Sequence, residues 1–145
     1  MQKLSITWLI TSIILLAQSV YMLVTFLNIL RWTFGFAPPR WAFFPSFWFA
    51  YSAFIILTIF TLLAGIMGVF NWKKPENAHP CFLLGLITIS VGLLSALIFH
   101  LSHLFFFWRD FLYFFLPVYV VYTVATYLYR KFSQSTEAEE PHGSE

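Results

Sequence analysis

The sequence predicts an all-α integral membrane protein: four transmembrane helices in a left-handed bundle, short loops and a disordered acidic C-terminal tail. Of the 145 residues, 60% are hydrophobic and only 10% are charged, against about 25% charged in soluble domains. A water-soluble core of this size could not hide so much apolar surface. The composition therefore excludes a soluble enzyme, a disordered regulator and a nucleic-acid-binding module.

Four uncharged apolar stretches lie between short clusters of charge and define the expected spans. They run over about residues 4–30, 47–70, 81–105 and 111–129. Each is close to or above the roughly 20 residues that a helix needs to cross a bilayer, and a helix satisfies its own backbone in lipid. The ~10-residue alternating segments of a β-barrel do not occur. We expect one transmembrane domain over residues 1–132 and a disordered polar tail over 133–145.

The first stretch has an alternative interpretation as a signal peptide, because Lys3 precedes an apolar run. The run is too long for a typical signal sequence and no clear small-residue cleavage site follows it. A permanent first span is therefore favoured. With four spans, one side of the membrane carries five Lys and Arg residues and the other carries three, so both termini are expected in the cytoplasm.

Small and polar residues recur at steps of three and four within the spans, which places them on one helix face. The second and third spans carry the glycines expected at helix contacts, namely Gly65, Gly68, Gly85 and Gly92. In the first span the series is Thr7, Thr11, Ile14, Gln18, Tyr21, Thr25 and Asn28. Such seams indicate helix packing in lipid. The alternative is a polar-lined cavity around Gln18, because a mid-span glutamine is costly without a partner.

Few residues could carry chemistry. No acidic residue lies inside a span, which argues against a proton-coupled transporter. His100 and His103 share a face of the third span and could bind a metal or haem, although capping of the span is the favoured interpretation. Cys81, the single cysteine, is either a palmitoylation site or a small apolar residue. In the fourth span, Tyr119, Tyr122, Tyr127 and Tyr129 suggest at least one membrane-interface anchor.

The loop between the first two spans, residues 31–46, is unusually aromatic and contains three prolines that prevent a regular helix. It predicts either an interfacial aromatic belt or a lid over a pocket for an apolar ligand. For the second case the candidate ligand-binding residues are Gln18, Trp32, Trp41, Phe44, Trp48 and Tyr51.

The segment PPRWAFFPSFWFAY, residues 38–51, resembles the PP-x-W segment after the first span of the translocator-protein (tryptophan-rich sensory protein) family. Val124, Tyr127 and Arg130 also fit a loose cholesterol-contact pattern. That family has five spans, and one extra residue interrupts the match here. Four-span sterol-isomerase-like proteins carry a similar loop together with membrane acids that this chain lacks. Small ciliary transition-zone tetraspanning proteins share its length and span spacing.

The sequence predicts a non-enzymatic membrane protein that acts as an accessory subunit or organiser by packing against other membrane proteins. A binder or carrier of a sterol, lipid or porphyrin is the first alternative, and a metal or haem site at the third-span histidines is the second. We expect membrane lipid as a partner, together with other membrane proteins or a second copy. Neither a cofactor nor nucleic acid is expected.

Overall fold

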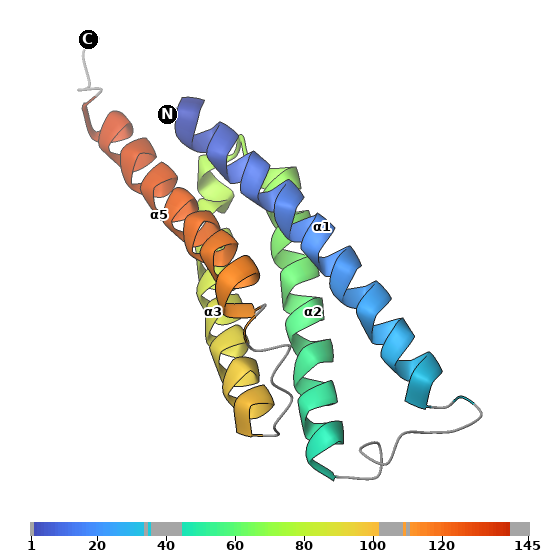
Figure 1. The fold of residues 1–145 in the computed structure, drawn as a ribbon. Helices are drawn as coiled ribbons and strands as arrows, with labels where there is room; N and C mark the ends of the chain where they lie inside the picture. The colour runs from blue at the N-terminus through green and yellow to red at the C-terminus, as the bar shows by residue number, and fades with distance from the viewer. Residues whose placement is uncertain (1, 34, 36–44, 102–108, 110, 140–145) are drawn as a thin grey trace, which may run out of the picture.

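The computed structural model describes residues 2–33, 35, 45–101, 109 and 111–139, and this part of the chain is almost entirely helical. Four long helices, α1 (Gln2–Thr33), α2 (Pro45–Asn71), α3 (Ala78–Leu101) and α5 (Leu116–Glu139), run alternately up and down (Figure 1). A short 3-10 helix, η2 (Pro75–Asn77), precedes α3, and a π-helical turn, η3 (Phe111–Phe115), leads into α5. The two ends of the chain lie at the same end of the bundle (Figure 1).

Each long helix packs against its neighbours in the chain, and α5 also packs against α1. The four helices therefore form a closed ring of contacts. All four are long and apolar enough to cross a membrane, with candidate spans Gln2–Arg31, Phe47–Asn71, Pro75–Leu101 and Leu112–Ser135. The expected class, four long apolar helices in an all-α chain, is confirmed.

Helix α5 continues to Glu139, so the prediction of a disordered tail from Ser133 onwards is wrong for residues 133–139. A helix needs no apolar face to extend a few turns beyond a packed body, because its backbone bonds are internal. Alanine and glutamate, which end this helix, are also good helix formers. The rest of the predicted tail, residues 140–145, lies outside the described residues.

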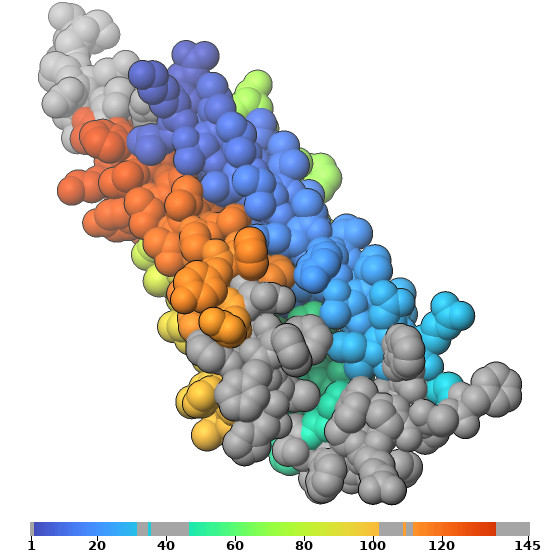
Figure 2. Space-filling view, in the orientation of Figure 1, coloured from blue at the N-terminus to red at the C-terminus, as the bar shows by residue number. Residues whose placement is uncertain are grey.

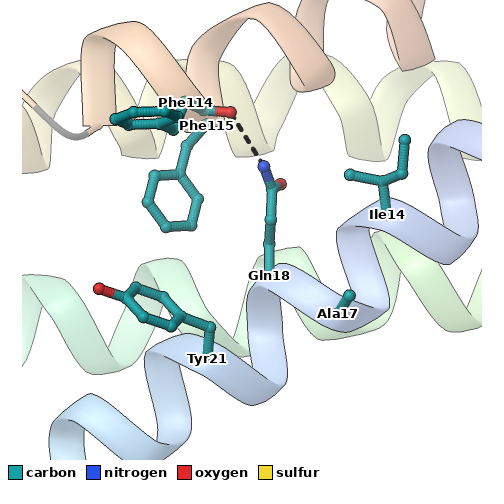
Figure 3. A pocket seen from close by; sticks show the side chains of 6 residues that line it. All are labelled: Ile14, Ala17, Gln18, Tyr21, Phe114 and Phe115. Atoms are coloured by element: carbon teal, nitrogen blue, oxygen red, sulfur yellow. Dashed lines mark hydrogen bonds between the residues drawn. The ribbon is translucent and has the colours of Figure 1, made fainter.

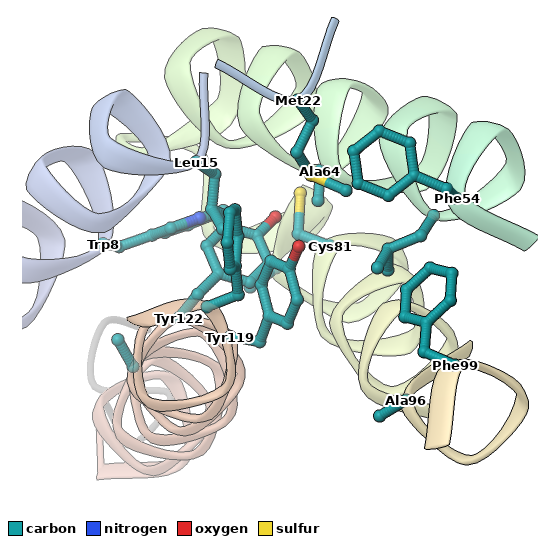
Figure 4. Packing of buried hydrophobic residues seen from close by; sticks show 14 of the residues in the cluster. Trp8, Leu15, Met22, Phe54, Ala64, Cys81, Ala96, Phe99, Tyr119 and Tyr122 are labelled. Atoms are coloured by element: carbon teal, nitrogen blue, oxygen red, sulfur yellow. The ribbon is translucent and has the colours of Figure 1, made fainter. Parts of the chain in front are cut away.

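Aromatic side chains fill the centre of the bundle. Trp8, Tyr119 and Tyr122 are each at most 1% exposed, and Figure 4 shows their rings converging between the helices together with Cys81. The Trp8 ring also contacts Tyr129 of α5, with ring centroids 5.5 Å apart. Large rings in van der Waals contact gain more by burial than any other side chains. The centre is thus filled by packed side chains.

The connection between α2 and α3 is short and held by asparagine. Asn71 Nδ2 donates to the Met67 carbonyl and Asn77 Nδ2 donates to Asn71 Oδ1, at 2.8 and 2.7 Å. The Lys74 amide donates to the Asn71 carbonyl at 2.8 Å. The Lys74 bond occupies the Asn71 carbonyl, one of the carbonyls that the end of α2 leaves without an intrahelical partner.

The face of α1 that packs into the bundle differs from the polar series expected in the sequence. The packed face runs through Ser5, Trp8, Ser12, Leu15, Ser19 and Met22, all buried. Most of the expected series is displaced from this face by one residue, or about 100° around the helix. Its one buried member is Thr11. Thr7 and Thr25 donate instead to the carbonyls of Lys3 and Tyr21 in their own helix, each at 2.9 Å. Because these hydroxyls have hydrogen-bond acceptors in their own helix, they need no partner in the interior of the bundle.

Candidate functional site

A surface groove of about 390 Å³ lies between the middle of α1 and the start of α5. Helices α1 and α5 run side by side along one face of the molecule (Figure 2). The groove is lined by Ile14, Ala17, Gln18, Tyr21, Phe114 and Phe115 (Figure 3). Its walls are mainly apolar, and the ring of Tyr21 lies 6.4 Å from that of Phe115. Apolar walls with a few polar groups are typical of sites for small apolar ligands.

Gln18 supplies the amide of the groove, beside the phenol of Tyr21, and it joins α1 to the turn η3 that leads into α5. Its Nε2 donates a hydrogen bond of 2.9 Å to the carbonyl oxygen of Phe114 (Figure 3). Phe114 belongs to the π-helical turn η3. Its carbonyl oxygen accepts this bond from a side chain of another helix.

The other half of the Gln18 amide is unused. Its Oε1 atom is buried and has no hydrogen-bond partner among the described residues. A buried amide oxygen without a donor costs free energy comparable to a lost hydrogen bond. The apolar wall of the groove thus contains one buried amide oxygen without a donor among the described residues. A ligand that reached this oxygen would need a hydroxyl or N–H group beside an apolar body.

The structure does not place the other candidate ligand-binding residues at this groove. Tyr51 is 8% exposed and stacks on Phe26 with ring centroids 4.7 Å apart. Its hydroxyl donates a hydrogen bond of 3.4 Å to the Phe26 carbonyl oxygen. Trp48 is 41% exposed on the same turn of α2. Phe26 is two turns beyond Gln18 on α1, so these aromatics form a separate contact. Trp41, Phe44 and the side chain of Trp32 lie outside the described residues.

Three of the four glycines expected at helix contacts lie where helices approach closely. A Cβ atom on Gly65 would lie 2.8 Å from Leu16 Cγ of α1. One on Gly68 would lie 2.8 Å from Ser12 Cβ and 2.9 Å from Tyr122 Cε2, and one on Gly85 would meet Thr123 Oγ1. The fourth, Gly92, is buried in α3. Close backbone approach at small residues is the usual way in which helices pack in lipid.

The candidate metal ligands remain a prediction. His100 is exposed at the end of α3, and His103 lies outside the described residues. Among the residues that the structure describes, no group of three or more His, Cys, Asp or Glu side chains could hold a metal ion. Cys81 is fully buried, a position that fits a small apolar residue and not an acylation site.

Sequence reasoning missed the buried hydroxyl pair between α2 and α5. Thr61 Oγ1 and Tyr119 Oη lie 2.6 Å apart with both residues buried. Tyr119 and Tyr122 had suggested an interface anchor, but they lie in the core, and of the four tyrosines only Tyr127 is exposed. The pattern that could have located them is the series Phe115, Tyr119, Tyr122, Thr126 and Tyr129. It steps by four and three along the buried face of α5.

Comparison of the chain with protein-family models, with curated proteins and with solved structures finds no match.

Proposed function

We propose that this is a non-enzymatic integral membrane protein that crosses the bilayer four times as a left-handed bundle, with both termini in the cytoplasm. In this proposal it acts as an accessory subunit or organiser by binding a helix of another membrane protein along α1. The support for insertion is the set of four long apolar helices. The support for a cytoplasmic location of the termini is the excess of Lys and Arg at that end of the bundle.

One observation carries the proposed role: α1 is the least covered of the four helices. In its most apolar window only 17% of residues are buried, against 39%, 33% and 39% in the other spans. Its exposed side carries an unbroken series at steps of four and three, namely Ile6, Ile10, Ile13, Ala17, Val20, Val24 and Leu27. That spacing is the seam of a left-handed helix pair, and β-branched residues dominate it. The face is therefore suited to pack against another transmembrane helix.

The test is native mass spectrometry of the protein released gently from its own membrane. A bound partner chain at fixed stoichiometry is the expected result. Ile13→Phe should remove that partner, because the larger ring would disturb a packed seam. Ile59→Phe is the matched control on α2, since Ile13 and Ile59 are 53% and 50% exposed. A monomer in the wild type, or equal partner loss in both variants, would refute the role of α1. A homodimer would show that a second copy of this chain binds the exposed face of α1.

Binding of an apolar ligand at the Gln18 groove is a second candidate function, favoured by the buried acceptor Oε1. Gln18→Met removes the amide while keeping the length of the side chain. We expect the wild type to retain cholesterol, used as the hydroxyl-bearing test ligand, and this variant to lose it. Retention by both proteins would exclude recognition of the hydroxyl by Gln18.

A further inference from the structure

A second surface groove, of about 400 Å³, runs between α3 and α5 on a different pair of helices from the Gln18 groove. From α3 it is lined by Phe82, Leu86 and Ile89, and from α5 by Val120, Val124 and Tyr127. Thr123 also lines it, but its hydroxyl donates to the Tyr119 carbonyl of its own helix at 2.8 Å. The groove therefore offers only apolar surface along its length.

Each wall of the groove is one face of a helix. Phe82, Leu86 and Ile89 step by four and three along α3, and Val120, Val124 and Tyr127 do the same along the antiparallel α5. The walls extend over about 10 Å at 1.5 Å per residue. Phe82 and Tyr127 meet at one end, with ring centroids 5.5 Å apart. The two walls thus enclose an open apolar groove about 10 Å long, which part of an acyl chain can occupy.

A cation lies one helical turn beyond the end that Phe82 and Tyr127 close. Arg130 follows Tyr127 by three residues, His79 precedes Phe82 by three, and Arg130 Nη1 lies 2.9 Å from His79 Nδ1. A guanidinium group can only donate, so the imidazole nitrogen is the acceptor. This hydrogen bond connects the two helices that form the groove walls.

Arg130 keeps donors for a further anion. Within the part of the chain whose side chains are described, no acidic side chain forms an ion pair with it, and its bond to His79 uses one of five guanidinium N–H donors. Lys131 is the next residue and continues the groove face, four residues after Tyr127. Both lie close to the end of the candidate span Leu112–Ser135, which is the depth at which lipid headgroups would meet the protein.

We propose that this groove binds an anionic phospholipid, with one acyl chain along the α3–α5 groove and the phosphate on Arg130. The charge at the groove end selects the headgroup, because guanidinium and phosphate form paired charge-assisted hydrogen bonds. The apolar walls hold the chain. Basic positions between helices at the cytoplasmic end of spans are suited to such headgroups.

The test uses the full chain in detergent with added phosphatidylglycerol or phosphatidylcholine of identical acyl chains, and counts retained lipids by native mass spectrometry. The wild type should retain one phosphatidylglycerol in preference to phosphatidylcholine. Arg130→Gln should lower this preference at least about tenfold, since hydrogen bonds to charged groups are among the strongest. Glutamine removes the charge but is two bonds shorter than arginine, so the bond to His79 is lost as well, and gel filtration checks that the bundle remains folded. Lys3→Gln, at the same end of the bundle but on α1, should leave the preference unchanged.

A second pair of variants tests the groove itself. Val124→Trp fills the groove and should reduce retention of both lipids. Val121→Trp is its matched control, because the two valines are 48% and 45% exposed on the same helix and only Val124 lines the groove. Gel filtration of each variant checks that it remains folded.

Three results would overturn the proposal. If Arg130→Gln and Lys3→Gln lost the preference for phosphatidylglycerol equally, the lipid would be attracted by the summed positive charge at that end of the bundle and not by Arg130. Unchanged retention in Val124→Trp would show that the chain lies elsewhere. Release of the bound lipid by excess inorganic phosphate would show a simple anion site that does not need the groove.

Discussion

Substitution of Gly68 by alanine should destabilise the bundle, although alanine is the better helix former. The added methyl carbon would lie 2.8 Å from Ser12 Cβ and 2.9 Å from Tyr122 Cε2, and would also overlap Ser12 Oγ. Real Cβ atoms do not approach other atoms this closely, and the obstructing groups come from two helices, α1 and α5. Helix α2 must therefore move away from both, or both must yield.

The size of the effect follows from two opposed terms. Gly→Ala within a helix is favourable by roughly 1 kcal/mol, whereas overpacking a close contact costs about 1–3 kcal/mol. Ser12 is fully buried and its hydroxyl donates to the Trp8 carbonyl at 2.7 Å, so it cannot turn away without losing that bond. We expect the cost to prevail, with a net loss of up to about 2 kcal/mol in the free energy of unfolding.

The assay is equilibrium unfolding of the detergent-solubilised protein by increasing fractions of SDS, followed by circular dichroism. The second-site variant Ser12→Gly removes Ser12 Cβ and Oγ, and should recover part of the loss when it is combined with Gly68→Ala. The double-mutant cycle then gives a favourable coupling between the two positions. A Gly68→Ala protein as stable as the wild type, or strictly additive effects of the two substitutions, would refute the close approach of α1 and α2.

Three further predictions concern the core and the ends of the chain. Tyr119→Phe removes the bond to Thr61 and should cost about 0.5–1.5 kcal/mol in the same unfolding assay. Tyr122→Phe should cost less, because the polar groups beside its hydroxyl are the Cys81 thiol and the Trp8 indole, and a thiol is a weak hydrogen-bond partner. A larger loss for Tyr122→Phe than for Tyr119→Phe would contradict the importance of the Thr61–Tyr119 bond. Cys81 should resist maleimide labelling in the folded protein and react in SDS, since it is fully buried; rapid labelling without SDS would show that α3 is packed otherwise. Tags at the two termini should be cleaved by protease from the same, cytoplasmic side of the membrane, and protection of only one of them would exclude an even number of spans.

The sequence contains enough information for the helices, because an apolar stretch of membrane-spanning length has few alternatives to a helix. It also indicates the inward faces of α2 and α3. In these helices glycine and hydroxyl residues share the buried side, as Thr61, Gly65 and Gly68 do in α2, and Gly85, Thr88 and Ser95 do in α3. Here small size decides which face can approach a neighbour, and size is visible in the sequence.

For α1 the inward face was predicted from the polarity of its residues and not from their size, and this prediction fails. Threonines 7 and 25 bond to their own helix, and the interior face alternates bulky residues with serines, among them Trp8, Ser12 and Leu15. Which of two adjacent faces turns inward depends on the partner helices, and no single helix encodes that choice. Gln18 was identified from its cost in lipid, but its partner, the Phe114 carbonyl, is a backbone atom 96 residues away. No side-chain pattern could reveal that partner.

The ring of contacts closes between the first helix and the last, and this has a consequence for biogenesis. A membrane protein is threaded into the bilayer from its N-terminus, so α1 enters long before the helix that completes its environment has been synthesised. Until then the amide of Gln18 has no Phe114 carbonyl to bind, and Trp8 lacks the ring of Tyr129. In the proposed topology, a nascent chain that stops before α5 would therefore carry a first span whose glutamine amide has no partner and whose inner face is incompletely packed.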